Sequence, residues 1–485
     1  MKKIKYIALC MMIILFNSCG NDWLDLQPST SIETEGSLTE LRDFEFILNG
    51  AYSSMQSSNY YGADMVCYGD LRGDDVKSYK SSSTNVSYYL FKYNKTNGPS
   101  GFWGMYYGRA KNLNVLLRDI EKVEIVPDRE ITTPTMLKMT EQEYFNDLKG
   151  EALAIRALLL FDMTRIYGYP YTKDNGASLS VPIIDYVISD KESKPTRNTT
   201  ADCYKAILSD LTTAVNLLRP ARKEGKINKW AAMTLLSRVY LYMGNNSEAL
   251  KIAEAAITGA ENKGYGLWSN EEYAEIWATP FNKELLFEIV NLTTDSPGKS
   301  SIGYLCTKYN LIATEKYWKN YMKGNKNDVR SQMVSAESSS KPYCLKYPSQ
   351  GGKSYEDANI PVFRMSELYL NAAEAAVKQN DITNARKYLA PIYARTGNSL
   401  DEIADGDINL DLVLEQRRIE FWGEGQRFFD LMRNNKKVIR TDYLEDVPKE
   451  AREFDWSYYK IVLPVPNAEM EYNENMVQNP GYDDN

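Results

Sequence analysis

The chain contains no histidine in its 485 residues. Because histidine supplies the base of Ser-His-Asp and Cys-His catalytic groups and ligates many metals, these kinds of site are excluded. Positive charge is also in deficit, and the formal net charge is −8. A nucleic-acid-binding protein is expected to carry a basic face, so nucleic acid is not a predicted partner.

Long hydrophobic runs are missing too, apart from a short one at the start of the chain. Three lysines in the first five residues precede ten apolar residues, 7–16, a length too short to span a membrane and typical of a signal peptide. Ser18 and Cys19 follow in a pattern that resembles a bacterial lipobox, although the two residues before them depart from it. We predict a signal peptide over 1–18 and lipidation of Cys19; an ordinary signal peptide with an incidental cysteine is the alternative.

The mature chain would begin with an anchor and a tether. Cleavage before Cys19 removes three lysines and no acidic residue, which lowers the formal charge from −8 to −11. A cysteine that carries more than one acyl chain anchors stably to a membrane. We therefore predict a lipidated tether over 19–35 and a single domain over 36–485.

Paired-cysteine motifs are absent. Beyond residue 19 the chain has four cysteines at spacings that match no CxxC metal or redox motif: Cys67, Cys203, Cys306 and Cys344. Buried free thiols are the simplest interpretation, and a disulfide between Cys306 and Cys344 stays open because the chain is exported. No cofactor is predicted. Acidic stretches such as 70–75 offer oxygens for Ca²⁺, but they lack the EF-hand spacing.

Helical periodicity dominates the middle of the chain. Apolar residues recur on one helical face in four segments: 147–168, 201–218, 229–243 and 247–258. The last two form a hairpin with tetratricopeptide-like small residues such as Ala253, and 363–394 forms a second such hairpin with Ala376. These patterns predict a mainly α fold, an α-α superhelix with a helical frame at about 145–260 and 361–435.

The densest charge cluster lies within 415–433. Glu420 and Glu424 resemble an acid/base pair, but they face the same way from one helix, whereas glycosidases place two carboxyls across a cleft. Arg417 and Arg427 would keep both carboxylates ionised, which denies either one the raised pKa of a general acid. We interpret the cluster as a structural ion-pair network.

Four blocks of the sequence resemble the SusD/RagB family. They are GEALAIRALLLFDMTRIYGYP at 150–170, FRMSELYLNAAEA at 363–375, EQRRIEFWGEGQRFFDLMR at 415–433 and IVLPVPNAEMEYNENMVQNPGY at 461–482. Cys19 followed by Trp23-Leu24-Asp25 also resembles the family's opening. The blocks follow the family order over almost the whole mature chain.

The resemblance implies a lipoprotein on the outer surface of the bacterial outer membrane, anchored through lipid on Cys19. Proteins of this family place tetratricopeptide-like units under an irregular ligand face and bind oligosaccharides without cleaving them. They deliver the glycan to a SusC-like TonB-dependent transporter, over which they close. We expect this non-enzymatic function here. Peptide or another nutrient on the same scaffold, or a glycoside hydrolase, are the alternatives.

Two irregular segments, about 52–104 and 291–360, are the predicted ligand face. Both are rich in loop-forming residues and tyrosine, and loops on a rigid frame often carry recognition. Sugars present apolar C–H faces that stack on aromatic rings, and hydroxyls that pair with planar polar groups. The candidate glycan contacts are Tyr60, Tyr61, Asp70, Arg72, Asp74, Tyr79, Tyr304 and Tyr309.

Overall fold

The computed structural model describes residues 38–187, 193–323, 327–335, 341–350 and 355–482. The predicted signal peptide, Cys19 and the tether lie outside these residues. The chain from Glu40 onward forms one unit, and the elements below belong to it.

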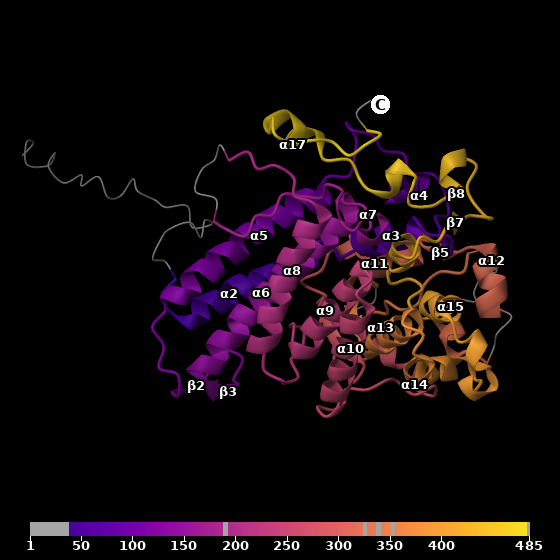
Figure 1. Cartoon of the computed structure of the whole chain (residues 1–485). Helices are drawn as coiled ribbons and strands as arrows, with labels where there is room; N and C mark the ends of the chain where they lie inside the picture. Colours follow the sequence, from indigo (N-terminus) through magenta and orange to yellow (C-terminus); the bar gives the residue numbers. More distant parts are fainter. Residues whose placement is uncertain (1–37, 188–192, 324–326, 336–340, 351–354, 483–485) are drawn as a thin grey trace, which may run out of the picture. The chain divides into compact units, whose positions relative to one another are not determined.

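Successive helices that pack on one another form the frame of this unit (Figure 1). They are α5 (Gly101–Asp119), α6 (Glu141–Tyr167), α8 (Thr200–Leu217), α9 (Lys229–Met243), α10 (Asn246–Glu261), α13 (Met365–Lys378) and α14 (Ile382–Tyr393). From α6 onward each of these helices contacts the next one named. The mainly α fold is confirmed, and α9–α10 and α13–α14 are the two predicted hairpins.

Local sequence sets the ends of these helices. Helix α6 begins six residues before its predicted start because Thr140 and Glu143 form a capping box: the Glu143 N–H donates to Thr140 Oγ1 at 3.2 Å, and the Thr140 N–H donates to Glu143 Oε2 at 2.9 Å. Helix α9 ends at Gly244, whose φ of 76° lies in the left-handed region that glycine tolerates.

Small residues allow α10 to pack closely against α13. Ala253 and Ala256 of α10 and Ala372 and Ala376 of α13 are fully buried, and α10 packs directly against α13. Since alanine has no side chain beyond Cβ, it allows two helices to approach closely. The chain therefore leaves the frame after α10 and rejoins it at α13, about a hundred residues later.

The segment between α10 and α13 is anchored at its base by a short antiparallel sheet. Strand β4 (Leu285–Ile289) pairs with β6 (Ile360–Arg364), which leads directly into α13. Beyond this sheet lie α11 (Ile302–Thr307), β5 (Ile312–Ala313) and α12 (Glu315–Tyr317). Strand β5 pairs in antiparallel register with β1 (Val76–Lys77), so the two irregular segments meet there.

The N-terminal segment is more regular than predicted. It contains α2 (Leu41–Met55), α3 (Asp64–Leu71) and α4 (Val86–Leu90). The expectation of a long loop is wrong for α3, in which every residue after Asp64 is buried. The reason is close backbone packing: a Cβ at Gly69 would lie only 1.8 Å from the carbonyl oxygen of Gly425, so the helix is pressed against the turn that contains Gly425.

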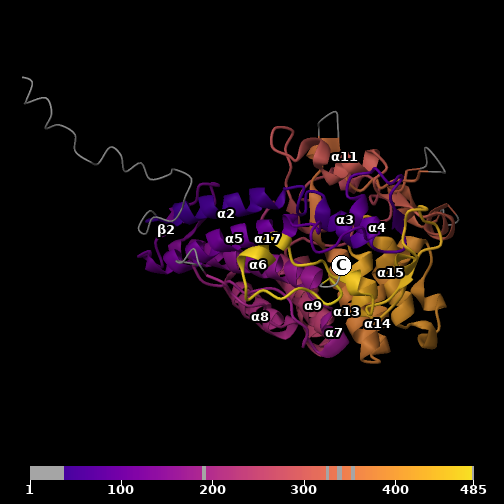
Figure 2. The ribbon, with the colours of Figure 1, turned by 90° about the horizontal axis from the view of Figure 1, so that it is seen from above.

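The remaining elements are short. They are α7 (Tyr171–Asp174), α15 (Leu410–Glu420), α16 (Arg427–Arg433), α17 (Asn467–Tyr472), β2 (Glu130–Thr132), β3 (Lys138–Thr140), β7 (Val438–Ile439) and β8 (Glu453–Phe454). Strands β2 and β3 form one antiparallel hairpin, and β7 pairs with β8. In Figures 1 and 2 the β2–β3 hairpin lies at one end of the frame, whereas α3, α4 and α11 gather toward the other.

The four cysteines beyond residue 19 are buried free thiols. Burial is the main reason that the pKa of the Cys67 thiol is raised. The thiols of Cys306 and Cys344 lie in side-chain hydrogen-bonding contact, the largest cause of the raised pKa of Cys306, ahead of burial. The predicted burial is thus confirmed, and the two cysteines of the open disulfide prediction are neighbours.

Candidate functional site

Three chain segments converge where β1 pairs with β5. The Tyr79 N–H donates to the Tyr309 carbonyl at 3.2 Å, just beyond the β1–β5 pairing. On the other side of β5, the Ala313 N–H donates to the Pro342 carbonyl at 2.8 Å, and Ile312 forms a bridge with Tyr343. Backbone pairing thus brings together tyrosines that are more than 200 residues apart in the sequence.

These tyrosines form a continuous aromatic surface, which we call the tyrosine face (Tyr79, Tyr309 and Tyr343). The ring centroids of Tyr79 and Tyr309 are 6.0 Å apart, and those of Tyr309 and Tyr343 are 5.6 Å apart, both in edge-to-face arrangement. Tyr79 is 41% exposed, and the other two side chains are half-buried. Partly exposed aromatic rings held in a fixed geometry suit stacking on an apolar face of a ligand.

Backbone strain also marks this face. Tyr309 has a φ of 61°, a left-handed conformation that bulky residues rarely adopt. Such strain concentrates at functional sites, because the surrounding structure must stabilise it. Here the pairing of β5 with β1 and with the segment at Pro342 provides that support.

A lysine lies over the tyrosine face. The ammonium nitrogen of Lys341 is 4.0 Å from the ring centroid of Tyr79 and 5.0 Å from that of Tyr309. A hydrogen bond with Lys341, followed by the charge of that lysine, lowers the pKa of the Tyr79 hydroxyl below its ordinary value. Tyr304 on α11 is half-buried, and the ammonium of Lys308 lies 4.9 Å from its ring centroid.

The prediction of Tyr60 and Tyr61 as ligand contacts is wrong, because both side chains belong to the core. Tyr60 is 1% exposed, and its hydroxyl donates to Asp162 at 2.6 Å. The ring of Tyr61 packs edge-to-face on Tyr60, with centroids 4.6 Å apart. Asp162 also accepts from Arg165 at 2.6 Å, so this part of the sequence forms a buried polar contact with α6.

Arg72, Asp70 and Asp74 are also occupied inside the protein. Arg72 is fully buried, with its guanidinium carbon 4.2 Å from the ring centroid of Tyr68 and 4.4 Å from that of Phe428.

The two aspartates have partners from the C-terminal part of the chain. Asp70 is buried and accepts from the Gly425 N–H at 3.1 Å. Asp74 accepts from Arg427 Nε at 2.8 Å. These partners lie more than 350 residues away in the sequence. Local composition therefore did not show that the two aspartates are paired, and they were predicted to contact a ligand.

Sequence reasoning missed Tyr343 and Lys341, which complete the tyrosine face. Both lie within the predicted irregular segment 291–360, and the Lys-Pro-Tyr order at 341–343 was the available signal. A proline next to a lysine and an aromatic residue indicates an extended segment that exposes side chains.

The charge cluster of 415–433 is a buried network, as predicted. Arg364 NH1 contacts Glu284 at 2.7 Å and Glu420 at 3.0 Å, and Arg364 NH2 contacts Glu424 at 2.9 Å. Burial alone would raise the pKa of Glu420, but the guanidinium groups of Arg395 and Arg364 lower it to about 2. A carboxyl that stays ionised and buried cannot serve as the general acid of a hydrolase.

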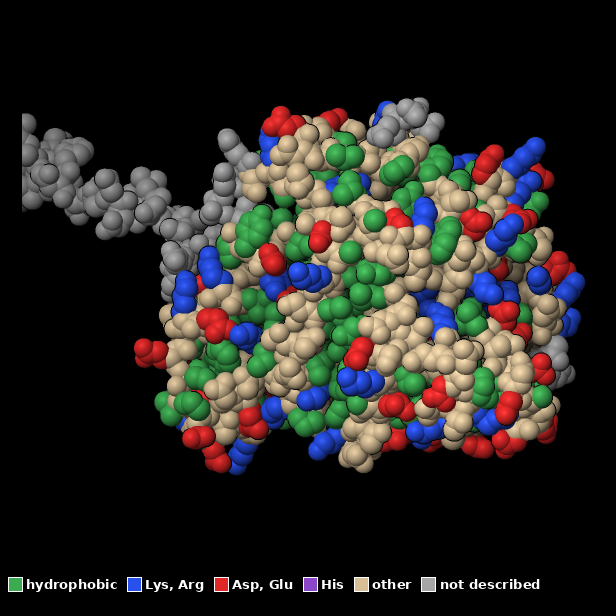
Figure 3. All heavy atoms as spheres, in the orientation of Figure 1, with side chains coloured by type: hydrophobic (Ala, Val, Ile, Leu, Met, Phe, Trp, Pro, Cys, Tyr) green, Lys and Arg blue, Asp and Glu red, His purple; other side chains and the backbone are tan. Residues whose placement is uncertain are grey.

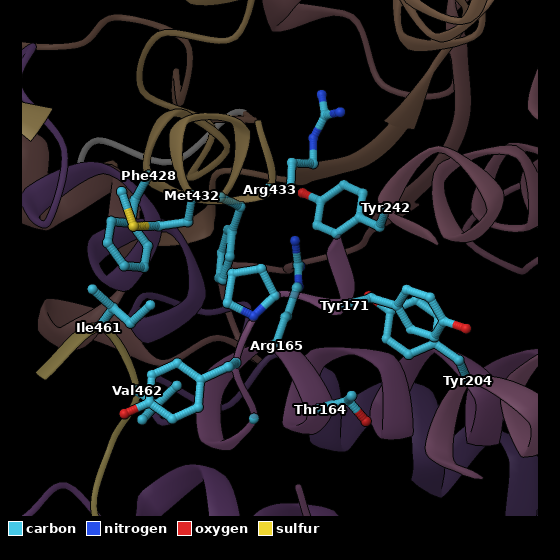
Figure 4. A pocket seen from close by; sticks show the side chains of 14 residues that line it. Thr164, Arg165, Tyr171, Tyr204, Tyr242, Phe428, Met432, Arg433, Ile461 and Val462 are labelled. Atoms are coloured by element: carbon cyan, nitrogen blue, oxygen red, sulfur yellow. The ribbon is translucent and has the colours of Figure 1, made fainter. Parts of the chain in front are cut away.

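Arg165 and Arg433 line a small pocket between α6, α9 and α16 (Figure 4). Its volume of about 20 Å³ has room for one water molecule and no sugar. Both arginines are already paired with carboxylates, Arg165 with Asp162 at 2.6 Å and Arg433 with Asp430 at 2.7 Å. This pocket is therefore part of the packed frame.

A larger cavity of about 520 Å³ lies beside the β2–β3 hairpin and α6. Several of its charged side chains pair with one another: Lys223 contacts Asp147 at 3.1 Å and Glu151 at 2.8 Å, and Lys226 contacts Glu45 at 2.9 Å. The cavity displays no pair of aromatic rings, so the tyrosine face remains the stronger candidate for a sugar ligand.

The comparisons with known proteins agree with this fold. The profile of the "SusD family" matches residues 299–482, and that of "Starch-binding associating with outer membrane" matches residues 22–241. A Bacteroides vulgatus protein of known structure is 47% identical, with a TM-score of 0.85, and the match covers 92% of this chain and 100% of that one. A second structure, a SusD superfamily protein of the same species, is 34% identical over the same shares, with a TM-score of 0.82. The chain belongs to the SusD family.

Two more distant SusD-family relatives are named for glycans. The starch-binding protein SusD of Bacteroides thetaiotaomicron is 31% identical over 136 residues, which are 27% of this chain and 22% of that protein. A laminarin-binding SusD-like protein shares the fold, with a TM-score of 0.71 at 20% identity over 92% of this chain and 100% of that one. Glycans are thus ligands within the family.

The family description also associates these proteins with the outer membrane. Within the part of this SusD-family chain that the structure describes, every helix is too short or too polar to cross a bilayer. One face of that part carries acidic and basic side chains interspersed with each other (Figure 3). The same described residues contain no group of three or more His, Cys, Asp or Glu that could hold a metal ion.

Proposed function

We propose that this SusD-family protein binds a glycan at the bacterial cell surface without cleaving it. The observation that carries the proposal is the tyrosine face, where three partly exposed rings at centroid distances of 5.6 and 6.0 Å meet on converging loops. Aromatic rings stack on the apolar C–H faces of sugars, and a fixed arrangement lowers the entropy that is lost on binding.

The chemistry of the carboxylates considered for catalysis fits capture better than hydrolysis. Glu420 and Glu424 are the carboxylates that the sequence offered for acid and base, and both are held by Arg364 in the buried network. Capture with later release requires only moderate affinity, and Kd values between mM and µM correspond to about −4 to −8 kcal/mol.

We further propose that Cys19 carries the lipid anchor and that the protein delivers its glycan to a SusC-like TonB-dependent transporter in the outer membrane. The predicted signal peptide and the SusD-family membership support this part of the proposal. An anchored protein searches a two-dimensional surface, so a tether of moderate length allows it to meet a transporter in the same membrane.

The test of glycan binding is affinity electrophoresis and calorimetry of residues 20–485 against plant, host-mucin and microbial polysaccharides. The variant Tyr79→Ala/Tyr309→Ala/Tyr343→Ala should lose at least about tenfold in affinity for the retained glycan, because each aromatic contact contributes roughly 0.5–1.5 kcal/mol. The matched control is Tyr186→Ala/Tyr443→Ala/Tyr472→Ala, which removes tyrosines that are 48%, 39% and 56% exposed elsewhere. It should bind as the parent does.

Other outcomes would replace the proposal. Equal losses in both triple variants would remove the tyrosine face as the site. Retention of a peptide pool, with no polysaccharide retained, would assign peptide cargo to the same scaffold. Release of reducing sugar from a bound glycan would establish hydrolysis instead.

The partner is tested by gentle detergent extraction of the full-length protein from its native membrane. We expect a large β-barrel protein to co-purify with it in a constant ratio. Cys19→Ser should abolish membrane association and, with it, this co-purification. A clean monomer from the parent protein would contradict the proposed partnership.

A further inference from the structure

The tyrosine face is basic although the protein as a whole is acidic. The three chain segments that carry its tyrosines are 76–85, 302–313 and 341–345. They contain four lysines and no aspartate or glutamate, in a chain whose formal net charge is −8. Because salt screens exposed charges over about 8–10 Å, the local charge governs what a ligand on this face experiences.

Three of these lysines have rings of the face, or of the adjoining α11, as their neighbours. Lys341 lies over Tyr79 and Tyr309, at 4.0 and 5.0 Å from their centroids. Lys308 lies 4.9 Å from the centroid of Tyr304. Lys80 follows Tyr79 directly, is exposed, and contributes with Lys341 to the lowered pKa of the Tyr79 hydroxyl, after the hydrogen bond from Lys341.

Four described acids on adjoining elements are already paired with other cations. Asp442 pairs with Lys77, the fourth lysine, and accepts from the Glu315 N–H at 2.9 Å. Glu315 itself pairs with Lys319.

Two further acids, in the two positions before β1, pair with arginines. Asp74 contacts Arg427 at 2.8 Å, and Asp75 pairs with Arg418. Asp446, whose carboxylate hydrogen-bonds Ser81, likewise pairs with Lys92 at 3.6 Å. These pairings leave the positive charges of Lys80, Lys308 and Lys341 available to a ligand.

We infer that the glycan bound on the tyrosine face is anionic, a polysaccharide that carries uronate carboxylates or sulfate esters. This inference rests on the proposed glycan-binding function. The rings stack on the apolar face of one sugar, while Lys341 contacts an anionic substituent of that sugar or of its neighbour. Lys80 and Lys308 act on the residues further along the glycan chain.

The ammonium group is suited to this role. It is a compact point charge on a flexible stem with three donors, so it follows an anion on a mobile polysaccharide without requiring one fixed geometry. A charge-assisted hydrogen bond to a carboxylate or sulfate is stronger than one to a neutral sugar hydroxyl. The affinity of such a face should therefore fall as salt concentration rises.

The experiment uses pairs of polysaccharides that differ only in charge. One pair is polygalacturonic acid and its carboxyl-reduced form, and the other is chondroitin sulfate and desulfated chondroitin, so that the two pairs separate carboxylate from sulfate. Calorimetry with residues 20–485 should show at least about tenfold tighter binding of the more highly charged member in one pair; desulfated chondroitin keeps its uronate carboxylates, so that pair tests sulfate alone. Raising NaCl from 50 to 500 mM should remove most of this preference.

Variants test the lysines themselves. Lys80→Gln/Lys308→Gln/Lys341→Gln should lose about tenfold or more in affinity for the charged polysaccharide, whereas Lys341→Arg should retain most of it. Lys263→Gln, at an exposed lysine after α10, is the matched control and should bind as the parent does.

The outcomes separate this inference from the proposed function. Equal affinity for both members of each pair, lost only in the tyrosine variant, would leave glycan binding standing and overturn the anionic ligand. Unchanged binding of the charged member by the lysine variant would overturn it as well. Failure to bind any polysaccharide, charged or neutral, would remove the proposed function together with the inference.

Discussion

Replacement of Arg364 by methionine is expected to lower the free energy of unfolding by about 3–5 kcal/mol. Arg364 lies at the end of β6, is buried, and contacts three carboxylates: Glu284 at 2.7 Å, Glu420 at 3.0 Å and Glu424 at 2.9 Å. Without it, each of these buried carboxylates loses one of the cations that balance it. Arg395 remains beside Glu284 and Glu420, and Lys346 remains beside Glu424. The resulting loss is larger than the net stability of the pairs, because the remaining charges stay buried.

Urea unfolding followed by circular dichroism measures this change. Lys319→Met is the control, because Lys319 and its partner Glu315 are both exposed and such a surface pair contributes about 1 kcal/mol or less. Arg364→Lys keeps the charge but loses the planar guanidinium, so an intermediate loss is expected. Equal stabilities of Arg364→Met and Lys319→Met would show that the network does not stabilise the fold.

The network has a consequence for the ligand face. It joins Glu284, the residue before β4, and Arg364 of β6 to Glu424, which also accepts from Lys346 at 2.6 Å. Lys346 is three residues beyond Tyr343. The same buried charges that lie beside the β4–β6 sheet therefore also hold the segment that carries Tyr343 of the tyrosine face.

The helical frame was predictable because its signals are local. Apolar periodicity and small residues place α6, α8, α9, α10, α13 and α14 within a few residues of their observed bounds, and only the start of α6 differs notably. A helix is stabilised by contacts between residues three and four apart, so its signal lies within one stretch of sequence. Ala253 and Ala376 also indicated the two helix hairpins, whereas the packing of α10 on α13 was not predicted.

The site was predictable only as a region, because its contacts are long-range. Tyr60 and Tyr79 have similar sequence surroundings, yet the first donates to Asp162 in the core and the second meets Tyr309 at the surface. The difference depends on partners about 100 and 230 residues away. No local pattern of polarity distinguishes a loop tyrosine that faces α6 from one that faces solvent.

The stability of the protein is expected to be greatest in mildly acidic solution and to fall as the pH rises toward 7. Burial raises the pKa of Asp70 to about 7, although a hydrogen bond from the Gly425 N–H opposes this. Burial also raises the pKa of Glu288 to about 7 and that of Asp64 to about 6. Between about pH 4 and 7 the folded chain binds protons that the unfolded chain has released, so its stability decreases with rising pH in that window.

The opposite sign applies at lower pH. The pKa of Glu420 is about 2 in the folded protein, below the value of an ordinary glutamate, about 4.3. Its contribution is fully present above the ordinary value and is lost as the pH falls toward 2. The two effects together predict a maximum of stability near pH 4, where the two windows meet.

Asp70→Asn tests the carboxyl group that is expected to change the free energy of unfolding most with pH. Asparagine keeps the oxygen that accepts from the Gly425 N–H but has no charge to bury, so at pH 8 the variant should be more stable than the parent by up to about 4 kcal/mol. The gain should vanish near pH 4, where the aspartate is already protonated in the folded chain. Urea unfolding from pH 3 to 8 measures both limits, with exposed Asp128→Asn as the control. If the free energies of unfolding of the parent and of Asp70→Asn changed with pH in parallel, Asp70 would ionise at an ordinary pKa. The buried contact between α3 and the turn at Gly425 would then accommodate a charged carboxylate, contrary to the prediction.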